Sequence, residues 1–99
     1  MVRKLQKADI DRVADIWLDT NLKAHDFISA QYWKRNFELV KEMLLQAEVY
    51  VYESDQKIQG FIGLNNDYIE GIFVSDKMQS QGIGKILLND TKDKRNELR

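Results

Sequence analysis

Residues 76–85, DKMQSQGIGK, place two of the chain's five glycines around one isoleucine, and a lysine follows directly. An apolar run precedes this stretch and apolar residues at helical spacing follow it, so it joins a predicted strand to a predicted helix. The first N–H groups of a helix have no internal acceptor, and the aligned peptide dipoles favour negative charge there. Gly82 and Gly84 carry no Cβ, so an anion can approach the main chain closely. This turn therefore predicts a binding site for an anion such as phosphate.

Polar side chains around the two glycines fit the same interpretation. Gln79 and Ser80 offer neutral donors, while Lys77 and Lys85 add positive charge. Between residues 77 and 99, six Lys or Arg outnumber three Asp or Glu, a local balance of +3 in a chain whose net charge is −1. The alternative interpretation of the glycines is a plain turn between a strand and a helix.

The spacing of the glycines excludes two common nucleotide-binding motifs. In the dinucleotide pattern G-x-G-x-x-G, the third glycine would fall on Leu87. In the P-loop pattern G-x-x-x-x-G-K-[ST], the first glycine would fall on Gln79 and the hydroxyl residue on Ile86. The pattern that is present is Q-x-x-G-x-G, over residues 79–84.

The elements that must position this turn form a small sheet covered by helices. Residues 2–5 predict a short strand, and apolar residues at helical spacing predict a helix over about residues 8–21 with Asp9 as its N-cap. Residues 21–29 predict a loop, after which Ser29 caps a second helix. From residue 47 the apolar period changes to two, and the polar turns SDQ and NND divide an antiparallel meander of three strands. The order strand, helix, helix, three strands, helix predicts an α+β or mixed α/β class with helices packed on the sheet.

Two apolar patterns predict which residues enter the core. In the second helix, one face carries Trp33, Phe37, Val40 and Leu44. In the middle strand of the meander, one alternating set is formed by Ile58, Gly60, Ile62 and Leu64.

Composition narrows the class of protein. The 99 residues suit one domain, and the absence of cysteine excludes disulfides, thiolate zinc sites and a cysteine nucleophile. No His/Asp/Glu cluster has metal-ligand spacing, so no metal is expected. The mixed signs of KDKRNELR and the lack of interleaved aromatic residues argue against nucleic acid. The sequence has no signal-like N-terminus and no run near the roughly 20 apolar residues that cross a bilayer, so no membrane association and a cytoplasmic location are expected.

With its flanking strand and helix, the Q-x-x-G-x-G turn resembles the central motif of the GNAT superfamily of N-acetyltransferases. The resemblance extends over the chain, because this family also begins with a strand, two helices and three antiparallel strands. The segments VRKLQKADIDRVADIW and HDFI are similar to small bacterial members. The resemblance implies an enzyme that moves an acetyl group from acetyl-CoA, its cosubstrate, to a primary amine by direct attack.

The resemblance also implies which residues hold acetyl-CoA. In the family, the turn binds the pyrophosphate through backbone N–H groups, and the strand before it pairs with the pantetheine arm. Carried onto this sequence, the cosubstrate contacts are Ile72, Phe73, Val74, Gln79, Ser80, Gln81, Gly82, Ile83, Gly84 and Lys85.

Three further residues are candidates for the reaction itself. Glu70 lies four residues before Val74 on the last predicted strand, and alternation places both side chains on one face. Its carboxylate could be a general base, directly or through water, as in some relatives; the alternative is a solvent-facing charge. His25, the one histidine, and Phe27 lie in a loop that the resemblance places near the acceptor, where they could bind substrate. The alternative is a histidine that packs in a surface loop.

The family continues past the motif helix with another strand, a helix and a closing strand. Residues 1–99 therefore look like the N-terminal portion of one GNAT domain, incomplete at its C-terminus. The last predicted strand would then be an unpaired apolar edge, which would allow a homodimer. Two functions stay open: an N-acetyltransferase acting on a small-molecule or protein amine, and a catalytically inactive GNAT-fold module that binds CoA weakly or serves in self-association.

Overall fold

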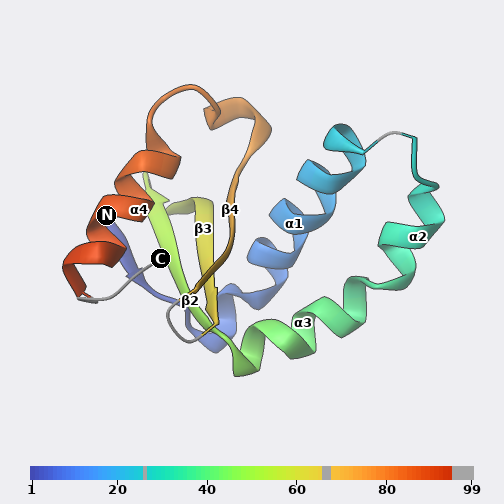
Figure 1. Cartoon of the computed structure of the whole chain (residues 1–99), viewed down its shortest axis with the longest axis horizontal. Helices are drawn as coiled ribbons and strands as arrows, with labels where there is room; N and C mark the ends of the chain where they lie inside the picture. The colour runs from blue at the N-terminus through green and yellow to red at the C-terminus, as the bar shows by residue number, and fades with distance from the viewer. Residues whose placement is uncertain (26, 66–67, 95–99) are drawn as a thin grey trace.

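The computed structural model describes residues 1–25, 27–65 and 68–94, which form an α+β fold with helices on both faces of one sheet (Figure 1). Among these residues the sheet has four antiparallel strands, in the spatial order β1 (Val2–Lys4), β2 (Glu48–Ser54), β3 (Lys57–Asn65) and β4 (Tyr68–Val74). To one side of the sheet lie α1 (Ile10–Ala24), α2 (Ala30–Arg35) and α3 (Phe37–Gln46), and α4 (Ile83–Lys94) covers the other face. Two short 3-10 turns, η1 (Lys7–Asp9) and η2 (Asp76–Met78), precede α1 and α4. The predicted fold class and order of elements are confirmed.

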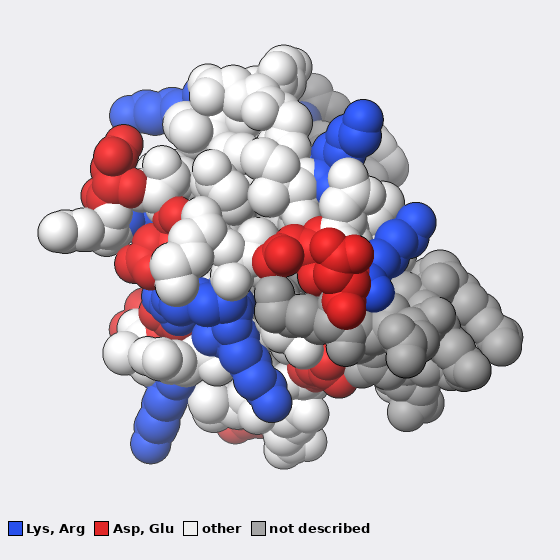
Figure 2. Space-filling view, turned by 90° about the vertical axis from the view of Figure 1, so that its left-hand side faces the viewer, with Lys and Arg blue, Asp and Glu red and all other residues white. Residues whose placement is uncertain are grey.

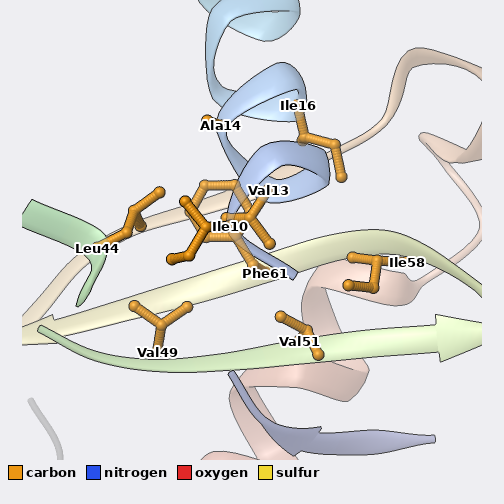
Figure 3. Packing of buried hydrophobic residues seen from close by; sticks show 9 residues of the cluster. All are labelled: Ile10, Val13, Ala14, Ile16, Leu44, Val49, Val51, Ile58 and Phe61. Carbon is orange, nitrogen blue, oxygen red and sulfur yellow. The ribbon is translucent and has the colours of Figure 1, made fainter. Parts of the chain in front are cut away.

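Two apolar clusters hold the helices to the sheet. Toward α1, the first cluster joins helix, strand and α3 residues (Figure 3): Ile10, Val13, Ala14, Ile16, Leu44, Val49, Val51, Ile58 and Phe61. Toward α4, the second joins Ile62, Leu64, Ile83 and Leu87. The helical spacing of the α1 members puts them all on one face, and each fully buried side chain of this size contributes about 1.5–3 kcal/mol. The sheet is therefore fixed from both sides, with β4 at one edge.

The SDQ turn between β2 and β3 is a two-residue hairpin. Asp55 and Gln56 have φ angles of 54° and 62°, the left-handed pair that matches the twist of the flanking strands. Past this turn the ladder skips Gln59, because Glu53 lies opposite Ile58 while Tyr52 lies opposite Gly60. The predicted alternating set is therefore wrong at Ile58, which joins the α1 cluster instead of the α4 cluster. The second predicted turn includes residues 66 and 67, which lie outside the described residues.

The helices differ from the prediction at their ends. The predicted second helix is divided at Asn36, whose side-chain amide donates to the carbonyl of Tyr32 at 2.7 Å. Its predicted apolar face nevertheless points to the core: Leu44 is buried, and Phe37 and Val40 pack partly buried against the same cluster. The N-cap at Ser29 is confirmed by a bond from the Gln31 N–H to its Oγ at 3.2 Å. Helix α1 continues to Ala24, so residues 21–24 of the predicted loop are helical.

Asp9 stands at the N-cap position of α1, but its carboxylate is used elsewhere. Arg3 binds it with two nitrogens, Nη1 to Oδ2 at 2.7 Å and Nη2 to Oδ1 at 3.1 Å. The Gln6 N–H donates to the same carboxylate at 2.8 Å, and Arg3 Nε reaches Glu53 at 2.9 Å. This half-buried network ties β1 to the start of α1 and to the end of β2, which explains why the predicted cap is replaced by an ion pair.

We expect Asp9→Asn to remove part of the acid dependence of stability. The ion pair with Arg3 lowers the pKa of Asp9 below its usual value of 3.8 in the folded protein. The unfolded chain therefore binds more protons in acid, so this stabilisation is present above the usual pKa and is lost as the pH falls through the folded-state pKa. Urea unfolding between about pH 3 and pH 6 measures the slope. Asp15→Asn, which changes an exposed carboxylate of α1, should keep the parent slope; an unchanged slope in Asp9→Asn would contradict the assignment.

Gly60 allows α4 to pack closely on β3. A Cβ at this position would lie 2.9 Å from the Phe73 carbonyl oxygen and 3.3 Å from Ile83 Cγ2. We expect Gly60→Ala to lower the free energy of unfolding by roughly 1–3 kcal/mol, because the added methyl meets backbone that cannot move aside cheaply. Gly63→Ala is the matched control on the same strand, because its Cβ would meet no atom of the described residues within 4 Å. Urea unfolding should separate the two variants, and equal losses would contradict this account.

Candidate functional site

The turn between β4 and α4 presents free backbone N–H groups. Gly82 has a φ of +80° and Ser80 a φ of 69°, so the chain reverses here through two left-handed residues. The first helical bond runs from the Ile86 N–H to the Gly82 carbonyl at 3.0 Å, which makes Gly82 the N-cap. The N–H groups of residues 82–85 lie before that bond and have no acceptor within the helix. A Cβ at Gly82 would meet nothing in the described part of the chain within 4 Å, so the main chain is open to a ligand here.

Gln79 has a structural role in this turn. Its side-chain Nε2 donates to the carbonyl of Val74 at 3.2 Å, and its backbone N–H donates to Asp76 at 3.4 Å. One amide hydrogen and the backbone N–H of Gln79 thus close the turn, and its role as a donor to a ligand stays a prediction. Ser80, Gln81 and Lys85 are exposed.

The remaining residues of the motif fix α4 against the strand. Ile83 is buried in the α4 cluster, and a Cβ at Gly84 would make ordinary contact with Ile72 Cγ2 at 3.6 Å. Further along the helix Leu87 is fully buried, whereas Ile86 is 43% exposed. An ion pair between Lys23 at the end of α1 and Asp76 of η2, with 3.2 Å between Nζ and Oδ2, bridges the turn to the opposite layer.

β4 presents alternate backbone groups at its outer edge. The Ser75 N–H donates to the Gln59 carbonyl of β3 at 2.8 Å, and Phe73 lies opposite Phe61 in the same ladder. The directions of the backbone N–H and C=O groups alternate along an antiparallel strand. Those of Phe73 therefore point toward β3, and those of Ile72 and Val74 point away from the sheet. β4 ends the described sheet, which leaves this edge available. Of the three strand residues predicted to pair with a ligand, Ile72 and Val74 fit, and Phe73 does not, because its backbone faces β3.

A cavity of about 660 Å³ opens beside β4 on the side of α1 and α3. Its lining is mostly apolar, with polar groups toward one end: Trp17, Val40, Met43, Leu44, Gln46, Ala47, Glu48, Val49, Phe61, Gly63, Leu64, Asn65, Glu70, Gly71 and Phe73. Such a mixture suits a ligand that is apolar along its length and polar at its tip.

Glu70 lines this cavity because β4 carries a bulge. Gly63 lies opposite Gly71 and Leu64 lies opposite Ile69, so Glu70 is the extra residue in the described ladder. The predicted common face with Val74 is therefore wrong: Val74 packs against the α4 cluster, while Glu70 lines the cavity with Gly71 on the α1 side. Bulges commonly redirect a side chain in this way near a functional site.

His25 and Phe27 lie in an aromatic group outside this lining. The His25 ring stacks on Trp33 with centroids 5.6 Å apart and meets Phe27 edge-on at 5.8 Å. Phe27 is 79% exposed. Trp33 in turn contacts Trp17, which does line the cavity, with centroids 5.8 Å apart. The structure thus brings Glu70 to the cavity and leaves the two loop residues one aromatic layer away.

The sequence patterns do not identify several residues that line the cavity. Trp17 is consistent with a simple core residue on α1, and its position at the cavity depends on the distant β3 and β4. The glycines at positions 63 and 71 carried a usable signal, because glycine inside a strand weakens it and often marks a bulge or the close approach of a ligand.

The face that carries α4 shows basic and acidic side chains interspersed (Figure 2). Lys77 and Lys85 are exposed next to the turn, while part of the basic count from residue 77 onward lies in residues 95–99, outside the described chain. Within residues 1–25, 27–65 and 68–94, no group of three or more His, Cys, Asp or Glu could hold a metal ion. None of the described helices is long and apolar enough to cross a membrane.

The architecture is shared with solved acetyltransferase structures. The solution structure of apo-form YjaB from Escherichia coli superposes with a TM-score of 0.83 at 23% identity, covering 99% of this chain and 67% of that one. The PaiA N-acetyltransferase from Thermoplasma acidophilum, solved in complex with coenzyme A, gives a TM-score of 0.78 at 16% identity, covering 94% of this chain and 69% of that one. At these identities, the likeness defines the fold as an acetyltransferase-type α+β fold.

Sequence comparison then gives the family. The model of the GNAT acetyltransferase domain matches residues 14–99, and the chain belongs to this family. The peptidyl-lysine N-acetyltransferase YiaC of Escherichia coli K12 is 32% identical over 90 residues, which cover 89% of this chain and 62% of YiaC. The peptidyl-lysine N-acetyltransferase YjaB of Salmonella typhimurium LT2 is 30% identical over 88 residues, 88% of this chain and 61% of YjaB. The chain spans about three fifths of the length of these relatives.

Proposed function

We propose that this chain binds acetyl-CoA between the free edge of β4 and the turn before α4, and transfers the acetyl group to a primary amine. The observation that carries the proposal is the open left-handed turn at Gly82, placed directly before the first helical hydrogen bond. A helix N-terminus with accessible N–H groups suits the phosphates of the cosubstrate. Membership of the GNAT family and the fold shared with a coenzyme A complex support the same assignment.

The direction of β4 gives the ligand its orientation. Val74 ends the strand next to the turn, while Glu70 lies near its beginning, beside the cavity. With the phosphates at residues 80–85, the pantetheine arm would run back along the outward groups of Val74 and Ile72. The thioester would then lie close to the bulge at Glu70, where the cavity opens.

The reaction requires a neutral amine at the thioester. The amine nitrogen forms a bond to the acetyl carbon, the carbon–sulfur bond breaks, and the sulfur leaves as a thiolate that takes up a proton. Glu70 is proposed as the general base that accepts the proton from the amine, directly or through water, since this residue lines the cavity. Most of the rate enhancement would come from holding amine and thioester together at the end of β4.

The acceptor is proposed to be a protein lysine. The relatives YiaC and YjaB are named peptidyl-lysine N-acetyltransferases. The mostly apolar cavity with a carboxylate at the β4 bulge is compatible with a long aliphatic amine.

An NMR titration of the ¹⁵N-labelled chain with acetyl-CoA tests the cosubstrate site. We expect saturable shifts of the amides of residues 80–85 and of Ile72 and Val74. Adenosine 3′,5′-bisphosphate, which lacks the pantetheine arm, should shift the turn and leave the β4 amides in place. The absence of any shift at millimolar acetyl-CoA would overturn the proposal.

A further inference from the structure

Gly63 occupies a position where neither the backbone nor the packing of the described residues requires glycine. It lies inside β3, and its φ is not in the left-handed region. A Cβ built there would find open space out to 4 Å within the described chain. Glycine in a strand interior forgoes side-chain packing and has a larger entropy loss on folding. Gly63 lines the 660 Å³ cavity, so the missing side chain leaves space in its wall.

The neighbouring glycine shows the contrast. Gly71 lies opposite Gly63 on β4, and a Cβ there would come within 2.7 Å of Phe73 Cε2. The space over Gly71 is therefore filled by the Phe73 ring, which stacks on Phe61 with centroids 4.9 Å apart. The space over Gly63 is not filled in this way. Of this pair of glycines, Gly71 is thus covered by an aromatic ring and Gly63 is open to the cavity.

The cavity above Gly63 has a mostly apolar lining and an acidic residue beside the β4 bulge. Trp17 from α1, Met43 from α3 and Phe61 from β3 contribute apolar surface. Glu70, the bulge residue next to Gly71, also lines the cavity and is exposed, so its carboxylate is accessible to a ligand there. Apolar walls suit methylene groups, and a carboxylate suits an ammonium group rather than an acyl chain.

We infer that Gly63 sets the depth of an acceptor slot that selects a primary amine at the end of an unbranched alkyl chain, as in a lysine side chain. This inference rests on the proposed function and specifies its acceptor site. The alkyl chain lies over Gly63 between Trp17 and Phe61, and the ammonium group reaches the Glu70 carboxylate at the end of β4. A side chain at position 63 shortens the slot and leaves the cosubstrate edge of β4 unchanged.

The experiment compares Gly63→Ala and Gly63→Val with the parent chain. Titrations monitored at the Trp17 indole and the Gly71 amide use three probes: Nα-acetyl-lysine methylamide, its norleucine analogue without the ammonium, and its 2,3-diaminopropionate analogue with a short chain. In the parent, the lysine probe should bind and the other two should bind at least tenfold more weakly. Gly63→Val should lower the affinity for the lysine probe at least tenfold, and Gly63→Ala should lower it less. Both variants should bind acetyl-CoA within twofold of the parent affinity and keep the parent melting temperature. Lys57→Val places a valine on the same strand outside the cavity lining and should match the parent.

Three results would overturn the inference. They are equal lysine-probe affinity in parent and Gly63→Val, equal affinity of the norleucine and lysine probes, and failure of the parent to bind the lysine probe. If Gly63→Val weakened a longer acyl-CoA and left the lysine probe unaffected, the slot would belong to the acyl chain instead. A parent that binds the lysine probe but not acetyl-CoA would reject the proposed function, while the slot itself would stand.

Discussion

Gly82→Glu is expected to weaken acetyl-CoA binding by roughly 100-fold or more, about 2.7 kcal/mol. The new carboxylate would lie at the N-terminus of α4, where the phosphates are proposed to bind. Two unit charges about 4 Å apart near a protein surface interact by about 4 kcal/mol, so repulsion of this size is sufficient. A side chain at a φ of +80° also costs about 1 kcal/mol or more of backbone strain. The open space around Gly82 should nevertheless accommodate the side chain without disturbing the core.

Two control variants separate charge from strain in this experiment. Gly82→Ala carries the backbone strain without the charge, and it should retain most of the affinity. Gln31→Glu adds the same charge at an exposed position on α2, far along the chain from the turn, and it should bind like the parent. Isothermal titration calorimetry gives the three affinities, with circular dichroism as the check on folding. A folded Gly82→Glu that binds acetyl-CoA normally would remove the turn from the proposed site.

Glu70→Gln is expected to lower turnover by about 10²–10⁴-fold while acetyl-CoA affinity stays unchanged. Glutamine keeps the length and shape of the side chain, so the bulge and the cavity wall should remain, but the amide cannot accept the proton of the amine. The rate is measured with a lysine peptide at saturating acetyl-CoA. Turnover equal to that of the parent would reject Glu70 as the base.

Glu48→Gln is the matched control for this substitution. Glu48 also lines the cavity, and its Oε2 accepts a bond from the Tyr50 hydroxyl at 3.0 Å. Glu48→Gln therefore removes a negative charge next to the cavity, from a carboxylate that is held by Tyr50 on the α4 side of the sheet. It should lower turnover much less than Glu70→Gln, and equal losses in both variants would indicate a general charge effect.

Local patterns in the sequence predicted the elements well where neighbouring residues decide the structure. The last strand of the meander was predicted to follow the turn NND and to contain Glu70 and Val74, and it is observed as Tyr68–Val74. The Ser29 cap was also predictable, since a hydroxyl and a nearby N–H are enough to form it. Asp9 shows the limit of this approach. Its carboxylate is held by Arg3, and Arg3 is itself oriented by Glu53 from another strand.

The features of the candidate site also differ in whether neighbouring residues in the sequence decide them. The turn at residues 79–85 could be predicted because a glycine turn and a helix start are local features. The cavity could not, because its walls come from α1, α3 and three strands that meet only in the folded chain. The register of β3 against β4 is also non-local, and the bulge that directs Glu70 toward the cavity follows from that register. A strict alternation rule therefore placed Glu70 on the wrong face.

The alternating backbone of β4 has a consequence for hydrogen exchange. In D₂O, the amides of Phe73 and Ser75 should exchange slowly because they face β3, whereas those of Ile72 and Val74 should exchange quickly at the open edge. Any strand-like ligand that pairs with this edge would slow the fast pair and leave the slow pair as it was. The exchange rates of the individual amides along the seven residues of β4 thus show whether a ligand pairs with the edge, because only every second amide should respond.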